Sequence, residues 1–118
     1  MTLSVRDISF RAITRHGYKS VEGSLIQGLG FHRILTTLGE VYEVKPDSVR
    51  ESTGLFDCHG FEIFNGDVLD TKNSTMDIKV KVVWDQDNAC YDVNYLAGGR
   101  YGRLNKKNAS NWYIVRKD

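Results

Sequence analysis

The chain has 118 residues, a formal net charge of +1, 41% hydrophobic residues and 26% charged residues. This length and composition predict one globular domain over residues 1–118 and argue against extensive disorder. A nearly neutral chain is not a general polyanion binder, and no apolar run approaches the roughly 20 residues of a membrane-spanning helix. The N-terminus lacks an export signal, so we expect a cytoplasmic protein without membrane contact, with Cys58 and Cys90 as free thiols.

Alternating apolar residues predict strands near the N-terminus. Within residues 5–14, Ile8, Phe10 and Ala12 share one face of a strand. The chain is then expected to turn around Gly17 and return as a short strand before Gly23.

The next segment has a mixed pattern. Gly28 and Gly30 argue against a helix that passes through them, whereas residues 31–38 could form one or two helical turns. Residues 41–44 alternate as a strand, and Pro46 suits the first position of a single helical turn.

The clearest pattern is a hairpin over residues 78–95 with an Asp/Asn-rich turn. Its apolar faces are Ile78, Val80, Val82 and Trp84 on the first strand, and Tyr91, Val93 and Tyr95 on the second. Residues 111–117 predict a final strand. Together these elements predict a mainly β fold, a small barrel-like or sandwich domain of short antiparallel strands with at most one or two short helical turns.

Residues 53–69 are typical of turns that bend a chain between short strands. Asp57 and Gly60 occupy the first and fourth positions of a predicted type I turn. Asn65 and Gly66 supply a second bend, because glycine tolerates a positive φ angle.

Reactive side chains in this stretch do not form a catalytic pattern. Cys58 and His59 are adjacent, so in an extended chain they point to opposite faces, and Cys90 has no cysteine or histidine at a zinc-ligand spacing. Four nearby carboxylates lack a calcium-loop spacing and are typical of turn formers: Asp57, Glu62, Asp67 and Asp70. We therefore expect no catalytic residue, no cofactor and no metal site.

A basic and aromatic segment covers residues 95–117. Residues 98–118 carry six basic residues against one acidic residue, which leaves ten basic and fourteen acidic residues in the rest of the chain. Cations interleaved with aromatic rings suit a nucleic-acid strand. The predicted contacts lie in or beside a Gly/Asn-rich loop: Arg100, Arg103, Lys106, Lys107, Tyr101 and Trp112. The alternative interpretation is a solvated loop followed by a core strand that buries Trp112 and Ile114.

A longer pattern in the middle of the chain resembles a known family. T-G-L-x-D-x-x-G-x-x-I-x-x-G-D-x-apolar is similar to the signature of the YopX-like proteins of phages and prophages. The matching positions are Thr53, Gly54, Leu55, Asp57, Gly60, Ile63, Gly66 and Asp67. Residues 8–12 and 82–93 resemble the family's opening strand and later hairpin, whereas residues 111–118 depart from its usual ending. The resemblance implies a β-rich domain, a phage or prophage origin and a location in the host cytoplasm, but no activity or catalytic residues.

These features favour a non-enzymatic phage or prophage accessory protein that binds another protein or self-associates as an oligomer. The alternative is a nucleic-acid-binding module that uses the basic and aromatic segment. The third hypothesis is an enzyme that uses Cys58 or the carboxylates around it.

Overall fold

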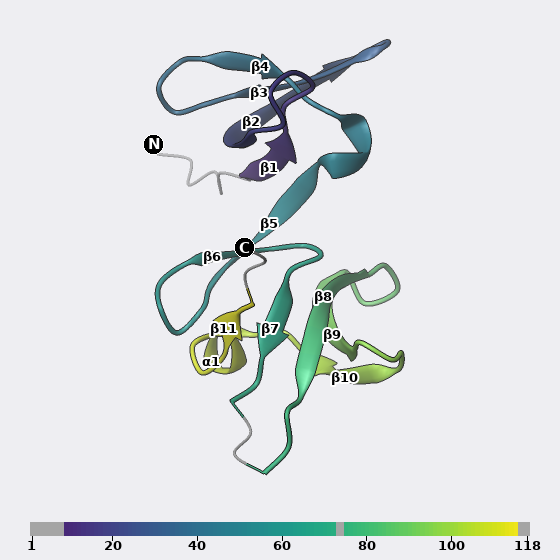
Figure 1. The fold of residues 1–118 in the computed structure, drawn as a ribbon. Helices are drawn as coiled ribbons and strands as arrows, with labels where there is room; N and C mark the ends of the chain where they lie inside the picture. The colour runs from purple at the N-terminus through teal and green to yellow at the C-terminus, as the bar shows by residue number, and fades with distance from the viewer. Residues whose placement is uncertain (1–8, 73–74, 116–118) are drawn as a thin grey trace, which may run out of the picture. The chain divides into compact units, whose positions relative to one another are not determined.

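The computed structural model describes residues 9–72 and 75–115 and is mainly β, with 52% strand (Figure 1). Its strands are antiparallel and are accompanied by one short 3₁₀ turn and one short helix, which confirms the predicted fold class. The strand orders are open, so neither sheet closes into a barrel in the described part of the chain. The chain divides into two compact units after Ser52, and each is described by itself. The single domain expected over residues 1–118 stays a prediction.

The N-terminal unit is an antiparallel sheet with the strand order β4-β3-β2-β1-β5. Its elements are β1 (Phe10–Ile13), β2 (Ser20–Gly28), β3 (Phe31–Leu35), β4 (Val41–Glu43), the 3₁₀ turn η1 (Pro46–Ser48) and the first half of β5 (Arg50–Phe56). A small core forms where alternate residues of these strands meet: Ala12, Val21, Ile34 and Val44 are buried together.

Two predictions for this unit were wrong. Residues 31–38 contain strand β3 instead of helical turns, because β3 is paired along its length with β2, from Gly28 opposite Phe31 to Ser24 opposite Leu35. A one- or two-turn helix is marginal by itself, and sheet pairing overrides it. The returning strand also does not stop before Gly23 but continues to Gly28.

Other predictions for this unit are confirmed. The strand expected at residues 41–44 is present as β4, and Pro46 lies in the first turn of η1. Phe10 and Ala12 lie in β1, whereas Ile8 is outside the described residues.

The C-terminal unit contains a second antiparallel sheet with the order β10-β9-β8-β7-β11 (Figure 1). After the second half of β5, its elements are β6 (Glu62–Phe64), β7 (Val68–Asp70), β8 (Lys79–Asp85), β9 (Cys90–Tyr95), β10 (Arg100–Arg103), the helix α1 (Lys106–Ala109) and β11 (Tyr113–Ile114). The core of this unit consists of Ile63, Leu69, Val80, Val82, Val93, Leu104, Ala109 and Trp112.

The predicted hairpin is confirmed as β8 and β9, which are paired from Val80 opposite Tyr95 to Asp85 opposite Cys90. Val80, Val82 and Val93 are fully buried in the middle of the predicted apolar face. Trp84 and Tyr95 lie at its two ends and are each 44% exposed. The interior of the hairpin therefore builds the core, while its ends leave aromatic rings at the surface.

The predicted basic loop was wrong in its local structure. Arg100 and Arg103 lie in strand β10, which pairs with β9, and Lys106 and Lys107 lie in α1. The helix begins there because the side chain of Asn105 accepts a hydrogen bond from the N–H of Asn108. The predicted final strand is only two residues long within the described part of the chain.

Candidate functional site

The family-like stretch folds as a turn whose geometry matches the prediction. The N–H of Gly60 donates to the carbonyl of Asp57 at 3.0 Å, and Gly60 has a φ angle of +82°. This conformation strains any residue that carries a Cβ atom, which explains the glycine. The turn at residues 57–60 is therefore confirmed.

The carboxylate of Asp57 holds this turn and also holds a distant strand. Its Oδ1 accepts the N–H groups of His59 and Phe61 at 2.9 Å each, and its Oδ2 accepts the N–H of Ile114 at 3.0 Å. Burial by itself raises the pKa of Asp57, but hydrogen bonds from the backbone of Ile114, Phe61 and His59, and the charge of His59, hold it below its usual value. Asp57 thus joins the motif to β11 as an ionised acceptor.

The first residues of the motif shape the end of β5. The hydroxyl of Thr53 donates to the carbonyl of Ile63 at 2.8 Å and accepts the N–H of Leu55 at 3.1 Å. Gly54 has a φ angle of +76°, and Leu55 packs against the core.

The last residues of the motif build the bend between β6 and β7. Ile63 is fully buried, and Gly66 has a φ angle of +93° and donates its N–H to the carbonyl of Val82. The carboxylate of Asp67 accepts the N–H of Phe64 at 2.8 Å. Asp67 is only 9% exposed, so its carboxylate serves the backbone of the bend.

Cys58 and His59 lie at the tip of the turn without forming a reactive pair. The N–H of Cys58 donates to the carbonyl of Trp112 at 2.8 Å, and the ring of His59 lies 5.9 Å from that of Tyr113. Both Cys58 and Cys90 are free thiols.

Two arginines of the basic segment, Arg100 and Arg103, are engaged with one carboxylate. Nε of Arg100 donates to Oδ2 of Asp92 at 3.0 Å, and Nε of Arg103 lies 4.0 Å from Oδ1 of the same residue. The hydrogen bond from Arg100 to Asp92 raises the pKa of Arg100. Asp92 is only 4% exposed, so the two arginines compensate a buried negative charge.

Two lysines of this segment, Lys106 and Lys107, differ from these arginines. Lys106 and Lys107 are exposed on α1, and the described residues 9–72 and 75–115 place no carboxylate within ion-pair distance of either ammonium. The structure thus separates the four predicted cations into two arginines that face Asp92 and two lysines without an ion-pair partner among the described residues.

Three aromatic rings of the segment contact one another in series. The ring centroids of Tyr95 and Tyr101 are 5.2 Å apart, and those of Tyr101 and Trp112 are 5.8 Å apart, both in edge-to-face geometry. Tyr95 is 44% and Tyr101 is 36% exposed, whereas Trp112 is 8% exposed in the core. We call Tyr95 and Tyr101 the aromatic patch. The burial of Trp112 argues against direct stacking of a base on its ring and favours the alternative interpretation at this position.

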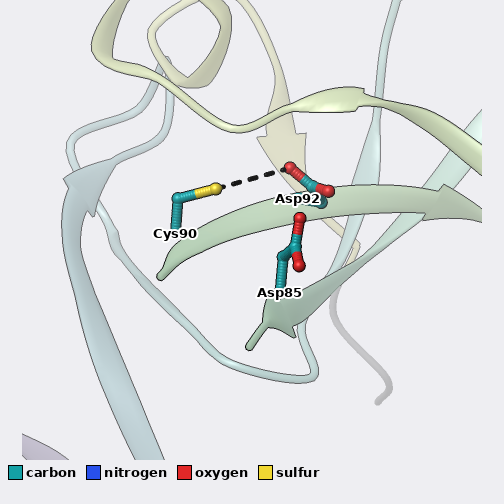
Figure 2. A group of neighbouring side chains, drawn as sticks. All are labelled: Asp85, Cys90 and Asp92. Atoms are coloured by element: carbon teal, nitrogen blue, oxygen red, sulfur yellow. Dashed lines mark hydrogen bonds between the residues drawn. The ribbon is translucent and has the colours of Figure 1, made fainter. Parts of the chain in front are cut away.

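One group of side chains with metal-ligand chemistry was missed from the sequence. Figure 2 shows Asp85, Cys90 and Asp92, whose ligand atoms all lie within 4.8 Å of one another. Cross-strand pairing places Asp85 opposite Cys90, and Asp92 lies two residues further along β9 on the same face. The predicted hairpin could have indicated this group, because its register already places these residues together.

The contacts of this group are those of an ion-pair network. Arg100 and Arg103 already face the two carboxylate oxygens of Asp92. A hydrogen bond from the side chain of Asn88 is the main reason why the pKa of Asp85 is lowered. Asp92 therefore anchors β10 by charge pairing, and Asp85 anchors the hairpin turn by hydrogen bonds.

The fold and these contacts define a small, mainly β protein whose central motif consists of residues that bend and tie the chain. No helix in the described residues is long and apolar enough to cross a membrane. The chain belongs to the YopX protein family, because the family model described as YopX protein matches residues 13–116. No curated protein shows significant similarity to the chain.

Proposed function

We propose that this YopX family protein is a non-enzymatic binding module that recognises another protein through the aromatic patch of its C-terminal unit. The proposal rests on one observation: Tyr95 and Tyr101 are partly exposed and contact each other, and Tyr101 also contacts the buried ring of Trp112. Rigid, partly exposed aromatic side chains are frequent anchors of protein interfaces. The family resemblance supports a phage or prophage accessory role in the host cytoplasm.

Two of the sheet edges, at β11 and β4, favour side-chain packing over strand addition. Beside β11, the Asp57 turn uses the N–H of Ile114 and the carbonyl of Trp112, so these groups are not free to pair with another chain. At β4, the carbonyl of Glu43 accepts the N–H of Arg15. Edges that are covered in this way discourage pairing with a foreign strand.

The contacts of the motif support a non-enzymatic role. The carboxylates of Asp57 and Asp67 are occupied by backbone N–H groups, and that of Asp70 accepts the N–H of Lys72 and the hydroxyl of Tyr113. A carboxylate that holds the fold in this manner is poorly suited to exchange protons with a substrate.

The proposal predicts that a Tyr95→Ser/Tyr101→Ser variant loses its protein partner. Tagged protein is expressed in phage-infected or lysogenic cells, and retained proteins are identified after nuclease treatment. We expect the wild type to keep its partner after nuclease treatment. The variant should retain at least about tenfold less partner, since a pair of interface anchors contributes roughly 2 kcal/mol or more of binding free energy.

Trp84→Ala is a matched control, because Trp84 is also 44% exposed and its ring contacts Tyr91 edge to face. This variant should retain the partner. Equal retention by wild type and the double tyrosine variant would contradict the proposal.

The nucleic-acid alternative is supported by the exposed ammonium groups of Lys106 and Lys107 on α1. It predicts that replacing Arg100, Arg103, Lys106 and Lys107 by alanine weakens retention of single-stranded DNA or RNA and reduces the salt dependence. The slope of log K against log salt should fall by about 0.7 for each phosphate contact that is lost. Unchanged binding in this variant, or no binding by the wild type at low salt, would eliminate the alternative.

A further inference from the structure

The C-terminal unit contains a cavity that neither the core nor the aromatic patch explains. Its volume is about 700 Å³, and it is lined by Gly66, Asp67, Val68, Lys79, Lys81, Leu96 and Val115. This volume lies within the range of ordinary small-ligand sites, about 300–1,000 Å³. Val68, Leu96 and Val115 provide apolar walls from three different segments of the chain.

One of the two lysines that line the cavity has no ion-pair partner among the described residues. Lys79 and Lys81 are two residues apart on β8 and therefore lie on the same face of the sheet. Nζ of Lys79 is held by the carboxylate of Asp77, at 2.7 and 2.8 Å. The described residues place no carboxylate within ion-pair distance of Lys81.

The acidic residue of the cavity is already used by the fold. Asp67 is only 9% exposed, and its carboxylate accepts the N–H of Phe64. The cavity therefore combines apolar walls with the ammonium of Lys81. A single uncompensated ammonium matches a monoanion better than a phosphate dianion, which recruits several cations or a bidentate arginine.

We infer that this cavity binds a carboxylate attached to an apolar body, with Lys81 as its cation and Val68, Leu96 and Val115 as its walls. Two sources share this chemistry: a small organic acid, and the C-terminal carboxylate of a peptide that ends in an apolar residue. If the ligand is a peptide C-terminus, the cavity would bind the C-terminal end of the protein partner. Only this second source rests on the proposed function.

The inference is tested by titrating the full-length ¹⁵N-labelled protein with N-acetyl-leucine and following the backbone amide shifts. We expect saturable shifts at Val68, Lys81 and Leu96. N-acetyl-leucinamide has the same apolar body without the charge, and we expect its dissociation constant to be at least about tenfold higher, as for loss of a charged hydrogen bond. The Lys81→Gln variant should weaken N-acetyl-leucine to a similar extent.

Lys106→Gln is the matched control, because it removes the same charge from an exposed lysine outside the cavity. It should leave the affinity unchanged. Lys81 is exposed, so the Lys81→Gln variant should fold normally, which unchanged amide shifts elsewhere would verify.

Three results would overturn the inference: equal affinity for the acid and the amide, an equal loss in the Lys106→Gln variant, or no saturable shift at the cavity. A third probe, 4-methylpentanoate, separates the two sources. If the protein binds 4-methylpentanoate as tightly as N-acetyl-leucine, the ligand is a small organic acid. If it binds 4-methylpentanoate more weakly, the ligand is a peptide C-terminus. Failure of these titrations is distinguishable from failure of the proposed function. The retention experiment tests the aromatic patch by substitution of its tyrosines and uses no small ligand.

Discussion

Replacing Asp57 by alanine should lower the free energy of unfolding by about 3 kcal/mol, because three backbone N–H groups lose their acceptor together. Two of these donors, His59 and Phe61, belong to the turn itself. The third donor, Ile114, lies 57 residues away in β11, and its hydrogen bond to Asp57 holds that strand in place. The substitution therefore loosens the turn and one edge of the C-terminal sheet at the same time.

The loss is measured by urea unfolding of the Asp57→Ala variant and of an Asp87→Ala control. Asp87 is exposed in the turn between β8 and β9, so its replacement should change the free energy of unfolding by less than about 0.5 kcal/mol. Hydrogen exchange should show a faster rate at the amide of Ile114 in the Asp57→Ala variant. Equal urea midpoints for this variant and the wild type would show that Asp57 does not hold the fold.

The dependence of stability on pH provides a second measurement on the same residue. The pKa of Asp57 in the folded protein lies below its ordinary value of 3.8. Its stabilisation is therefore present above pH 3.8 and is lost as the pH falls from that value through the lower pKa of the folded state. The Asp57→Asn variant keeps one carbonyl acceptor but cannot ionise, so its stability should fall less steeply in this acidic range.

The Gly23→Ala variant should lose about 3 kcal/mol of unfolding free energy through a clash inside the N-terminal sheet. At Gly23, β2 changes neighbours, since Gly23 pairs with β1 while Ser24 pairs with β3. A Cβ atom at this position would overlap the backbone carbonyl of Leu35. Because a backbone atom cannot rotate away as a side chain can, β2 and β3 would have to separate.

Gly102→Ala is the matched control for this prediction, because a Cβ atom at Gly102 would meet nothing within 4 Å. Thermal unfolding and hydrogen exchange of β2 and β3 are measured for both variants. The Gly23→Ala variant should unfold at a lower temperature with loss of protection in both strands. Indistinguishable behaviour of the two alanine variants would contradict the close approach at Gly23.

Predictions from local patterns were accurate where one strand face alternates or a turn demands particular residues. The hairpin could be predicted because Val80, Val82 and Val93 must share a face if they are to be buried. The turn at Asp57 and Gly60 could be predicted because few residues tolerate a positive φ angle or cap the backbone with a side chain. Both signals depend on neighbouring residues and are therefore visible in the sequence.

Predictions failed where a segment's conformation depends on pairing or packing with another segment. Residues 31–35 form a strand because β2 and β4 pair with them on both sides. Arg100 and Arg103 were predicted to lie in a loop as possible nucleic-acid contacts, but β10 pairs with β9 and brings both side chains to Asp92. Trp112 was a candidate for base stacking, yet it is buried in the core. The exposure of a charge or ring is decided by what packs on it, which one segment of sequence does not specify.

The sequence by itself determined the mainly β class, the hairpin and the turn residues, because these depend on short-range periodicity and backbone geometry. The resemblance to the YopX family was also visible in the sequence, in the motif of residues 53–69. Only the tertiary structure decided that Asp57 holds β11, that Gly23 lies against Leu35 and that Lys81 lines a cavity. Each of these features depends on how separate segments pair and pack, which outweighs local preference.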